Sequence, residues 1–147
     1  MRYVHTNIIA KDWKALSKFY QKVFKLKPIG PERNISGQWI DDLTNIENVH
    51  IVGEHLLFPG YNENTPTLEI FTYYYSVGRE KQLNLCGFSH IAFEVENVEE
   101  TVEAILKEGG SILGKIVKKD YGEMGIGTFA YTTDIEGNII ELQNWKK

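Results

Sequence analysis

The segment GFSHIAFEVENVEETVEAILKEGG, residues 87–110, predicts a strand that runs directly into a capped helix. Over residues 88–95, the large apolar side chains at 91, 93 and 95 alternate with polar or small ones, as they do in a half-buried strand. Asn97 with Glu100 three residues later has capping-box spacing, with Asn in place of the usual Ser or Thr. The helix has an apolar face at helical spacing, formed by Val98, Val102, Ile105 and Leu106. The Gly-Gly pair 109–110 is expected to end it.

The same order of elements occurs at the start of the chain, in HTNIIAKDWKALSKFYQKVFKL, residues 5–26. A short strand over 3–10 precedes a helix for which Asp12 is a suitable N-cap. Pro28 prevents much further helix. The apolar face of this helix consists of Trp13, Leu16, Phe19, Tyr20, Val23 and Phe24. The chain therefore contains two copies of one strand–helix pattern.

The two copies align in detail. His5 matches His90, and Asp12 matches Asn97, so each cap follows its histidine by seven residues. Candidate strands follow both helices: 35–43, 49–58 and 67–74 after the first, and 112–118, 128–133 and 139–145 after the second. The segment DIEGNIIEL supplies the turn of the last hairpin. Self-similarity at a period of roughly 70 to 85 residues indicates a tandem duplication.

The predicted fold class is α+β, with tandem βαβββ modules. We expect the modules to form a curved, mixed and mostly antiparallel sheet, with the helices on its outer face. The chain is predicted to be a single domain, 1–147, with module one at about 1–75, a linker at about 76–86 and module two at about 87–147.

Composition limits the classes of function. The chain has 147 residues and a net charge of −4, without a basic stripe, which argues against nucleic-acid or membrane partners. It has no apolar run near the roughly 20 residues of a membrane span and no signal-peptide pattern, so we expect a cytoplasmic protein. Cys86 is the single cysteine and lacks an activating histidine pattern, so we expect a packed thiol in a reducing compartment.

Strand alternation separates polar from aliphatic faces. His5, Asn7 and Ile9 share one face of the first strand, and His90 shares a face with Ala92 and Glu94. Near the end of the first half, Glu69 shares a strand face with Phe71 and Tyr73, and near the end of the second half, Glu141 shares one with Trp145. The aliphatic residues directly beside each glutamate point to the opposite face. One such histidine or glutamate is commonly structural. The joint occurrence of His and Glu at equivalent places in both halves favours a shared metal site.

The chain resembles the vicinal oxygen chelate superfamily, which includes glyoxalase I, methylmalonyl-CoA epimerase, extradiol dioxygenases, and bleomycin- or fosfomycin-resistance proteins. The resemblance covers essentially the whole chain. It lies in residues 5–26 and 87–110, in PTLEIFTY, and in TTDIEGNIIELQNW, which is similar to the family's closing DPDGNxIEL segment with Ile135-Glu136 in place of Pro-Asp. It implies a metal-binding cleft, a small-molecule substrate and a homodimer.

The resemblance implies four metal ligands: His5, Glu69, His90 and Glu141. Two imidazoles and two carboxylates suit one divalent ion such as Zn, Ni, Co, Mn or Fe(II). Four protein ligands leave two octahedral positions for vicinal substrate oxygens, and the metal then stabilises an enediolate or enolate. In glyoxalase I-like enzymes the base corresponds to Glu141, with Glu69 as the alternative. Asn7, Phe71, Tyr73 and Trp145 are candidate substrate-cleft residues.

The predicted function is therefore a metal-dependent glyoxalase-like lyase or isomerase. Ile9 stands where bacterial glyoxalase I usually carries an arginine on the glutathione side, and Glu69 stands where methylmalonyl-CoA epimerases usually carry glutamine. The sequence accordingly predicts the reaction class and does not identify a particular enzyme within it. The alternatives are a metal-independent binding or resistance protein for aromatic or cationic drugs, or an extradiol dioxygenase, for which a fourth protein ligand would fill a position that oxygen needs.

Three other features have structural interpretations. His50 and His55 are expected to be structural or cleft-lining, with Gly53 between them as a possible bulge. The glycine-rich run 121–127 opens no helix, so we expect a mobile flap and not a phosphate loop.

Overall fold

The computed structural model describes residues 1–78 and 80–147. The chain divides into two compact units, Met1–Gly78 and Arg79–Lys147, and each is described by itself. The linker that the sequence predicts, 76–86, includes Arg79, which lies outside the described residues. Across the described ranges, no helix has the length and apolar content that crossing a membrane requires.

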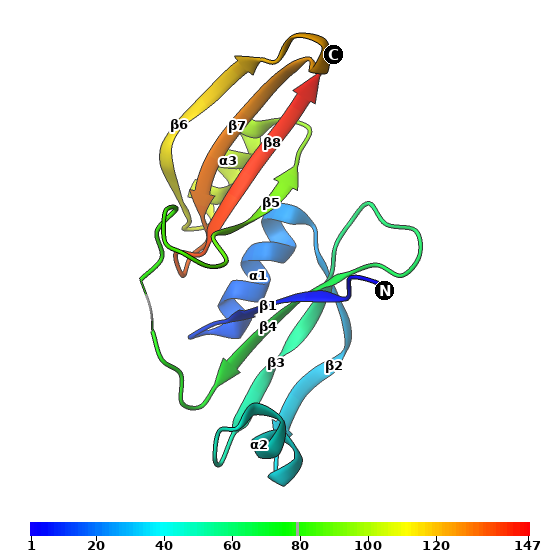
Figure 1. Cartoon of the computed structure of the whole chain (residues 1–147), viewed down its shortest axis with the longest axis vertical. Helices are drawn as coiled ribbons and strands as arrows, with labels where there is room; N and C mark the ends of the chain where they lie inside the picture. The colour runs from blue at the N-terminus through cyan, green and yellow to red at the C-terminus, as the bar shows by residue number, and fades with distance from the viewer. Residues whose placement is uncertain (79) are drawn as a thin grey trace. The chain divides into compact units, whose positions relative to one another are not determined.

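The first unit contains a four-stranded sheet with the order β1-β4-β3-β2 (Figure 1). β1 is parallel to β4, and the other pairs are antiparallel. In chain order its elements are β1 (His5–Ile9), α1 (Trp13–Phe24), β2 (Lys27–Ser36), α2 (Gln38–Thr44), β3 (His50–Leu57) and β4 (Thr67–Tyr73). The unit is therefore a βαβββ module with one additional short helix.

The second unit repeats this topology with the sheet order β5-β8-β7-β6. β5 is parallel to β8, and the other pairs are antiparallel. Its elements are β5 (His90–Glu94), α3 (Val98–Lys107), β6 (Ser111–Asp120), the 3₁₀ turn η1 (Gly122–Met124), β7 (Ile126–Thr133) and β8 (Ile139–Lys146). The predicted tandem βαβββ fold is confirmed, as two mixed sheets of four strands each.

Both predicted helix caps are present. The Asp12 carboxylate accepts a hydrogen bond from the Ala15 amide at 3.0 Å. The Asn97 side-chain oxygen accepts one from the Glu100 amide at 3.1 Å, and its Nδ2 donates to the Glu100 carboxylate at 2.8 Å. This pair is an Asn–Glu variant of the capping box, because the carboxylate receives the Asn side chain in place of the cap's backbone N–H.

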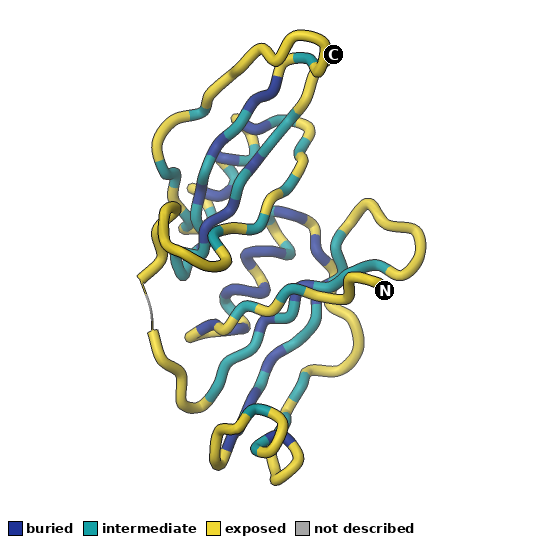
Figure 2. The backbone as a smooth tube through the Cα atoms, viewed as in Figure 1, coloured by how far each residue is buried: buried dark blue, intermediate teal, exposed yellow. Residues whose placement is uncertain are grey.

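One face of each sheet is covered by the helix of its unit. α1 packs on β3 and β4, and α3 packs on β6, β7 and β8. The apolar residues on these faces are fully buried: Leu56, Leu68 and Ile70 in the first unit, and Ile140 and Leu142 in the second. Figure 2 shows dark, buried segments along the central strands of both sheets. We call the opposite side of each sheet, which carries the polar and aromatic side chains, its open face.

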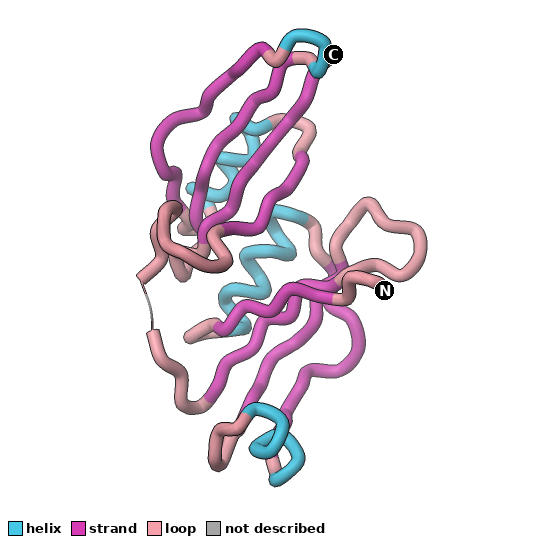
Figure 3. The backbone as a smooth tube through the Cα atoms, in the orientation of Figure 1, coloured by secondary structure: helices cyan, strands magenta, loops and turns pink. Residues whose placement is uncertain are grey.

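The strand predicted over 35–43 is wrong. The second strand is instead β2, Lys27–Ser36, and Gln38–Thr44 forms α2 directly after it (Figure 3). Pro28 and Pro31 make this segment resemble a loop, but β2 is the last strand in the sheet order, where a missing N–H costs little. Ile40 of α2 is buried in a cluster with Val49 and Ile51, so its apolar character comes from helix packing.

A bulge recurs at the same place in both units. In β2 the three residues 30–32 face the single Glu54, and in β6 the three residues 114–116 face Ala130. Both bulges begin with a glycine at positive φ, Gly30 at 72° and Gly114 at 76°. Glycine adopts this conformation without steric cost. The duplication thus extends to backbone irregularities.

The bulge expected at Gly53 is absent, because the register of β3 with β4 continues without interruption from Ile51 to Leu57. Gly53 instead permits a close approach of two strands. A Cβ at this position would lie 2.1 Å from the Ile70 carbonyl oxygen and 2.5 Å from the Phe71 ring. Because the register is uninterrupted, the side chain of His55 lies on the same face as that of Glu69.

We expect Gly53→Ala to lower the free energy of unfolding by about 2–3 kcal/mol, because the added methyl group overlaps backbone atoms that repacking does not easily displace. Urea denaturation followed by circular dichroism measures the change. Gly78→Ala is the control, since a Cβ there has no neighbour within 4 Å, and it should be neutral. Equal stability of the two variants would contradict the steric argument.

Candidate functional site

In the first unit, the open face brings His5 to Glu69. Nδ1 of His5 lies 3.4 Å from Oε1 of Glu69, and the two side chains are 44% and 12% exposed. Asn7, the direct neighbour of Glu69 in the β1–β4 register, donates from Nδ2 to Oε2 at 3.2 Å. The predicted metal ligands of this half are thus in contact, with a predicted cleft residue beside them.

His55 also contacts Glu69, which the sequence did not predict. It lies opposite Glu69 in the β3–β4 register, and its Nε2 is 3.4 Å from Oε1. Burial lowers the pKa of His55, while the Glu69 carboxylate acts in the opposite direction. The imidazole also meets the ring of Phe71 edge-on, at 5.6 Å between centroids. Glu69 therefore lies between two histidines and an asparagine.

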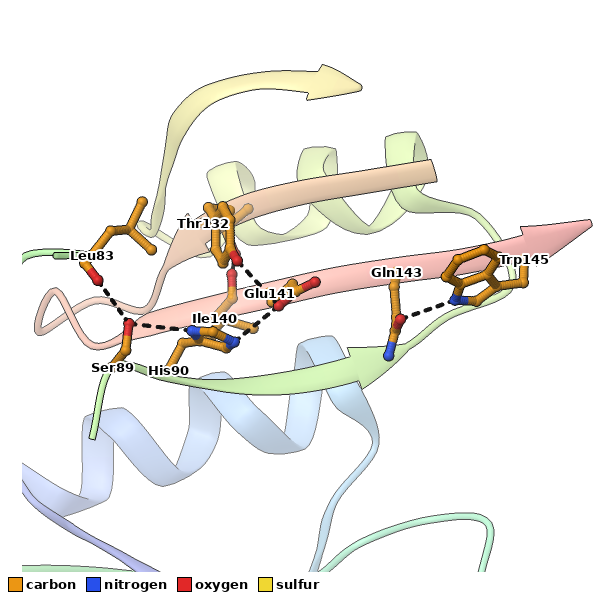
Figure 4. A network of polar contacts seen from close by, with 9 residues as sticks. Leu83, Ser89, His90, Thr132, Ile140, Glu141, Gln143 and Trp145 are labelled. Atoms are coloured by element: carbon orange, nitrogen blue, oxygen red, sulfur yellow. Dashed lines mark hydrogen bonds and ion pairs between the residues drawn. The ribbon is translucent and has the colours of Figure 1, made fainter. Parts of the chain in front are cut away.

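In the second unit, the open face brings His90 to Glu141. Nε2 of His90 lies 2.9 Å from Oε2 of Glu141 (Figure 4). On its other side, Nδ1 of His90 is 3.3 Å from Oγ of Ser89, which donates to the Leu83 carbonyl at 3.2 Å. These contacts orient the ring, as outer groups commonly do for metal-binding histidines.

Tyr131 has the same place in the second unit that His55 has in the first. It lies opposite Glu141 in the β7–β8 register, and its hydroxyl donates to Oε2 at 3.3 Å. Burial, followed by the nearby charge of Glu141, raises the pKa of Tyr131, so the phenol remains protonated. Each half therefore holds its glutamate between a first-strand histidine and a third-strand partner.

The other predicted cleft residues differ in their surroundings. Phe71 and Tyr73 are partly buried against the cluster of Ile40, Val49 and Ile51 beside α2. Trp145 is 36% exposed, and its Nε1 donates to Gln143 at 3.0 Å.

Two further expectations can be compared with the structure. His50 stacks on Tyr74 with 4.0 Å between ring centroids, and its Nε2 lies 2.6 Å from the side-chain oxygen of Asn34. Cys86 is exposed, so the prediction of a packed thiol is wrong. Cys86 lies in a run of turns and bends over residues 83–87, all of which are exposed.

The donor set fits a divalent metal chemically. Imidazole nitrogen and carboxylate oxygen together suit Zn, Ni, Co, Mn and Fe(II). Each His–Glu pair contributes one nitrogen donor and one oxygen donor. Within 1–78 and 80–147, no three His, Cys, Asp or Glu side chains are placed as a complete metal site. Each unit thus presents one His–Glu pair on its open face.

The fold occurs in several solved structures. A glyoxalase family protein from Bacillus cereus superposes with a TM-score of 0.78 at 19% identity, covering 100% of this chain and 94% of that one. A glyoxalase I mutant from Zea mays gives 0.66 at 21% identity, covering 97% of this chain and 44% of that one. The fosfomycin resistance protein FosX from Listeria monocytogenes, complexed with Mn(II) and sulfate, gives 0.55 at 16%, covering 99% and 92%. At these identities the likeness shows the fold alone.

Comparison with curated proteins gives no match. A family model does match, over residues 2–142, and its description is the glyoxalase/bleomycin resistance protein/dioxygenase superfamily. This match agrees with the paired βαβββ topology and with the resemblance found in the sequence. The chain belongs to the glyoxalase/bleomycin resistance protein/dioxygenase superfamily.

Proposed function

We propose that this protein is a metal-dependent lyase or isomerase that removes a proton next to a carbonyl group of a small substrate. The observation that carries the proposal is the repeated His–Glu contact: His5 with Glu69 and His90 with Glu141, at equivalent positions of the two open faces. In both units the histidine precedes the strand neighbour of its glutamate by two residues. A coincidence of this kind favours one shared role.

His5, Glu69, His90 and Glu141 would hold one divalent metal, in one chain or across two chains of a homodimer. Light scattering in solution distinguishes a dimer from a monomer. When bound, the metal would supply Lewis acidity toward two vicinal oxygens of the substrate. FosX, a neighbour of the same fold, is described as a complex with Mn(II), which supports a divalent ion. The remaining chemistry belongs to the side chains of this chain.

The contacts of the two glutamates support Glu141 as the base. Glu69 is engaged at both oxygens, since His5 and His55 meet Oε1 and Asn7 meets Oε2. The side-chain contacts described for Glu141 converge on Oε2, from His90 and Tyr131. We therefore assign proton transfer to Oε1 of Glu141. A carboxylate with one oxygen anchored and the other available is suited to take a proton from carbon.

A second candidate is a metal-independent protein that binds aromatic drugs. An exposed group of aromatic rings around Trp145 favours it. The presence of both His–Glu pairs weighs against it, because binding an aromatic molecule requires neither. An extradiol dioxygenase is less well supported, since four protein ligands leave two positions where that reaction uses three.

The experiment that tests the proposal is a substrate panel assayed with Ni, Co, Zn and Mn in turn. It contains hemithioacetals of methylglyoxal with glutathione and other thiols, 2-methyl-branched acyl-CoA thioesters, and catechols. We expect turnover, or deuterium uptake from solvent, for a substrate with two chelating oxygens and a proton on the adjacent carbon. Cleavage of a catechol would contradict the proposal, and so would activity that persists after complete removal of metal.

A further inference from the structure

Three aromatic side chains, Tyr121, Phe129 and Trp145, form an exposed group on the second unit, here called the aromatic cluster. Ring centroids lie 5.3 Å apart for Tyr121–Trp145, 5.3 Å for Phe129–Trp145 and 6.1 Å for Tyr121–Phe129. The rings meet tilted or edge-on, as aromatic side chains prefer. Tyr121 and Trp145 remain 43% and 36% exposed. The cluster therefore presents ring surface to solvent.

The cluster shares the open face with Glu141. Phe129 pairs with Gln143 and Gly127 with Trp145, in the same register that places Tyr131 opposite Glu141. Side chains two and four residues apart on a strand project to the same side, so Gln143 and Trp145 follow Glu141 along β8. At about 3.3 Å per residue, Trp145 lies roughly 13 Å beyond Glu141. Figure 4 shows Gln143 and Trp145 farther along the strand from the His90–Glu141 contact.

Local contacts fix the rings in place. The Trp145 indole is held by its hydrogen bond to Gln143, 3.0 Å long. Opposite Trp145, Gly127 has no side chain, and a Cβ there would lie 2.4 Å from the Phe129 ring and 3.2 Å from the Trp145 ring. The glycine thus allows both rings to lie close against the strand. An aromatic surface with restricted rings loses little entropy on binding a ligand.

The first unit covers the corresponding place with its own chain. There Phe71 and Tyr73 pack against the cluster that contains Ile40 of α2, which is 5% exposed. The same connection in the second unit holds only η1, three residues long, and no α2 equivalent. Trp145 takes the place of Tyr73 in the repeat, yet it remains accessible. The difference between the units leaves an aromatic surface exposed on the same face as the second His–Glu pair.

We propose that the aromatic cluster binds a flat aromatic group of the substrate, while two oxygens at the other end of the same molecule bind at the metal. This inference rests on the proposed function for the position of the oxygens. The ligand class is a hydroxy acid, keto acid or thiohemiacetal whose aryl group is separated from the two oxygens by a chain of several carbons, because Glu141 and Trp145 lie roughly 13 Å apart along β8. Gln143, between Glu141 and Trp145, supplies an amide for polar atoms between the two ends. A small molecule suits this surface because the polar and aromatic groups follow one strand.

The test compares binding of 2-hydroxy-6-phenylhexanoate and 2-hydroxyhexanoate, which share the hydroxy-acid group and the carbon chain but differ in a phenyl ring, to the metal-loaded protein by calorimetry. We expect the phenyl-bearing acid to bind about tenfold more tightly, since ring stacking plus burial contributes on the order of 1.4 kcal/mol. Trp145→Ala should reduce this preference to about twofold or less. Trp39→Ala is the control, because Trp39 lies on α2 and is 59% exposed, and it should retain the full preference.

A second measurement separates this inference from the metal proposal. Benzyl alcohol, which lacks the chelating pair, should shift the indole N–H signal of Trp145 in NMR spectra with or without metal, and leave that of Trp39 unchanged. If benzyl alcohol shifts the signal but neither acid binds, the cluster is supported and the metal proposal fails. An equal affinity for the two acids, or no shift at Trp145, overturns the inference. A Trp145 signal that moves on dilution alone also overturns it, because a second copy then covers the rings.

Discussion

Glu141→Gln is expected to slow substrate deuterium exchange by about 10²–10⁴-fold, the usual cost of losing a general base. Glutamine preserves the length of the side chain and its contacts with His90 and Tyr131, but it does not accept a proton from carbon. Substrate should still bind, because its oxygens are held elsewhere. The measurement is proton exchange at the reacting carbon, followed by NMR in D₂O with the best substrate of the panel.

Glu103→Gln is the matched control for this variant. It makes the same chemical change at an exposed position of α3, on the opposite side of the sheet from Glu141, and its exchange rate should equal that of the parent protein. If Glu141→Gln exchanges deuterium at the normal rate, Glu141 serves only as a ligand. The proton transfer would then belong to Glu69 or to another base.

His90→Ala is expected to remove most of the bound metal. Loss of an outer partner of a ligand already costs about 10–100-fold in metal affinity, so loss of a proposed ligand should cost more than that. Elemental analysis of protein purified without chelator should fall from about one metal ion per site to a small fraction. The parent protein should also lose thermal stability on treatment with a chelator, because metal bound only to the native state stabilises it by about 4 kcal/mol at 1,000 times its dissociation constant.

His50→Ala controls for the loss of an imidazole in general. His50 bonds to Asn34 and stacks on Tyr74, so its removal should leave the metal content unchanged. The chelator should have no effect on the melting temperature of His90→Ala, since little metal remains to be withdrawn. Unchanged metal content in His90→Ala would refute the assignment of His90 as a ligand.

The repeat was predictable because both copies carry the same local signals. A capped helix follows a histidine-bearing strand by the same spacing, and side-chain caps act over only three residues. It was also predictable that His5, Glu69, His90 and Glu141 lie on the polar faces of their strands, because the alternation of side chains depends only on the sequence of each strand. Local rules of this kind account for the order of the elements and for the strand face that carries each histidine and glutamate, whereas the contact within each His–Glu pair also depends on strand register.

Long-range packing explains the failures. The strand expected over 35–43 is wrong because a short helix there buries Ile40 against residues of β3, and sequence periodicity is ambiguous over so few residues. The role of His55 was missed because it depends on the register between β3 and β4. A register is set jointly by the hydrophobic patterns of both strands and by the turn that joins them, so no single segment of the sequence specifies it. Tyr131 was missed for the same reason.

The paired bulges of β2 and β6 have a consequence for how the protein behaves at high concentration. Both strands stand last in the order of their sheets, and a regular outer strand is a template on which other chains can polymerise. The bulge, in which three residues of the outer strand face one residue of its neighbour, interrupts that template in each sheet. Within the interruptions, Pro31 has no N–H to donate and Lys115 places a charge at the rim. The duplication has thus copied, along with the fold, a safeguard against fibril growth.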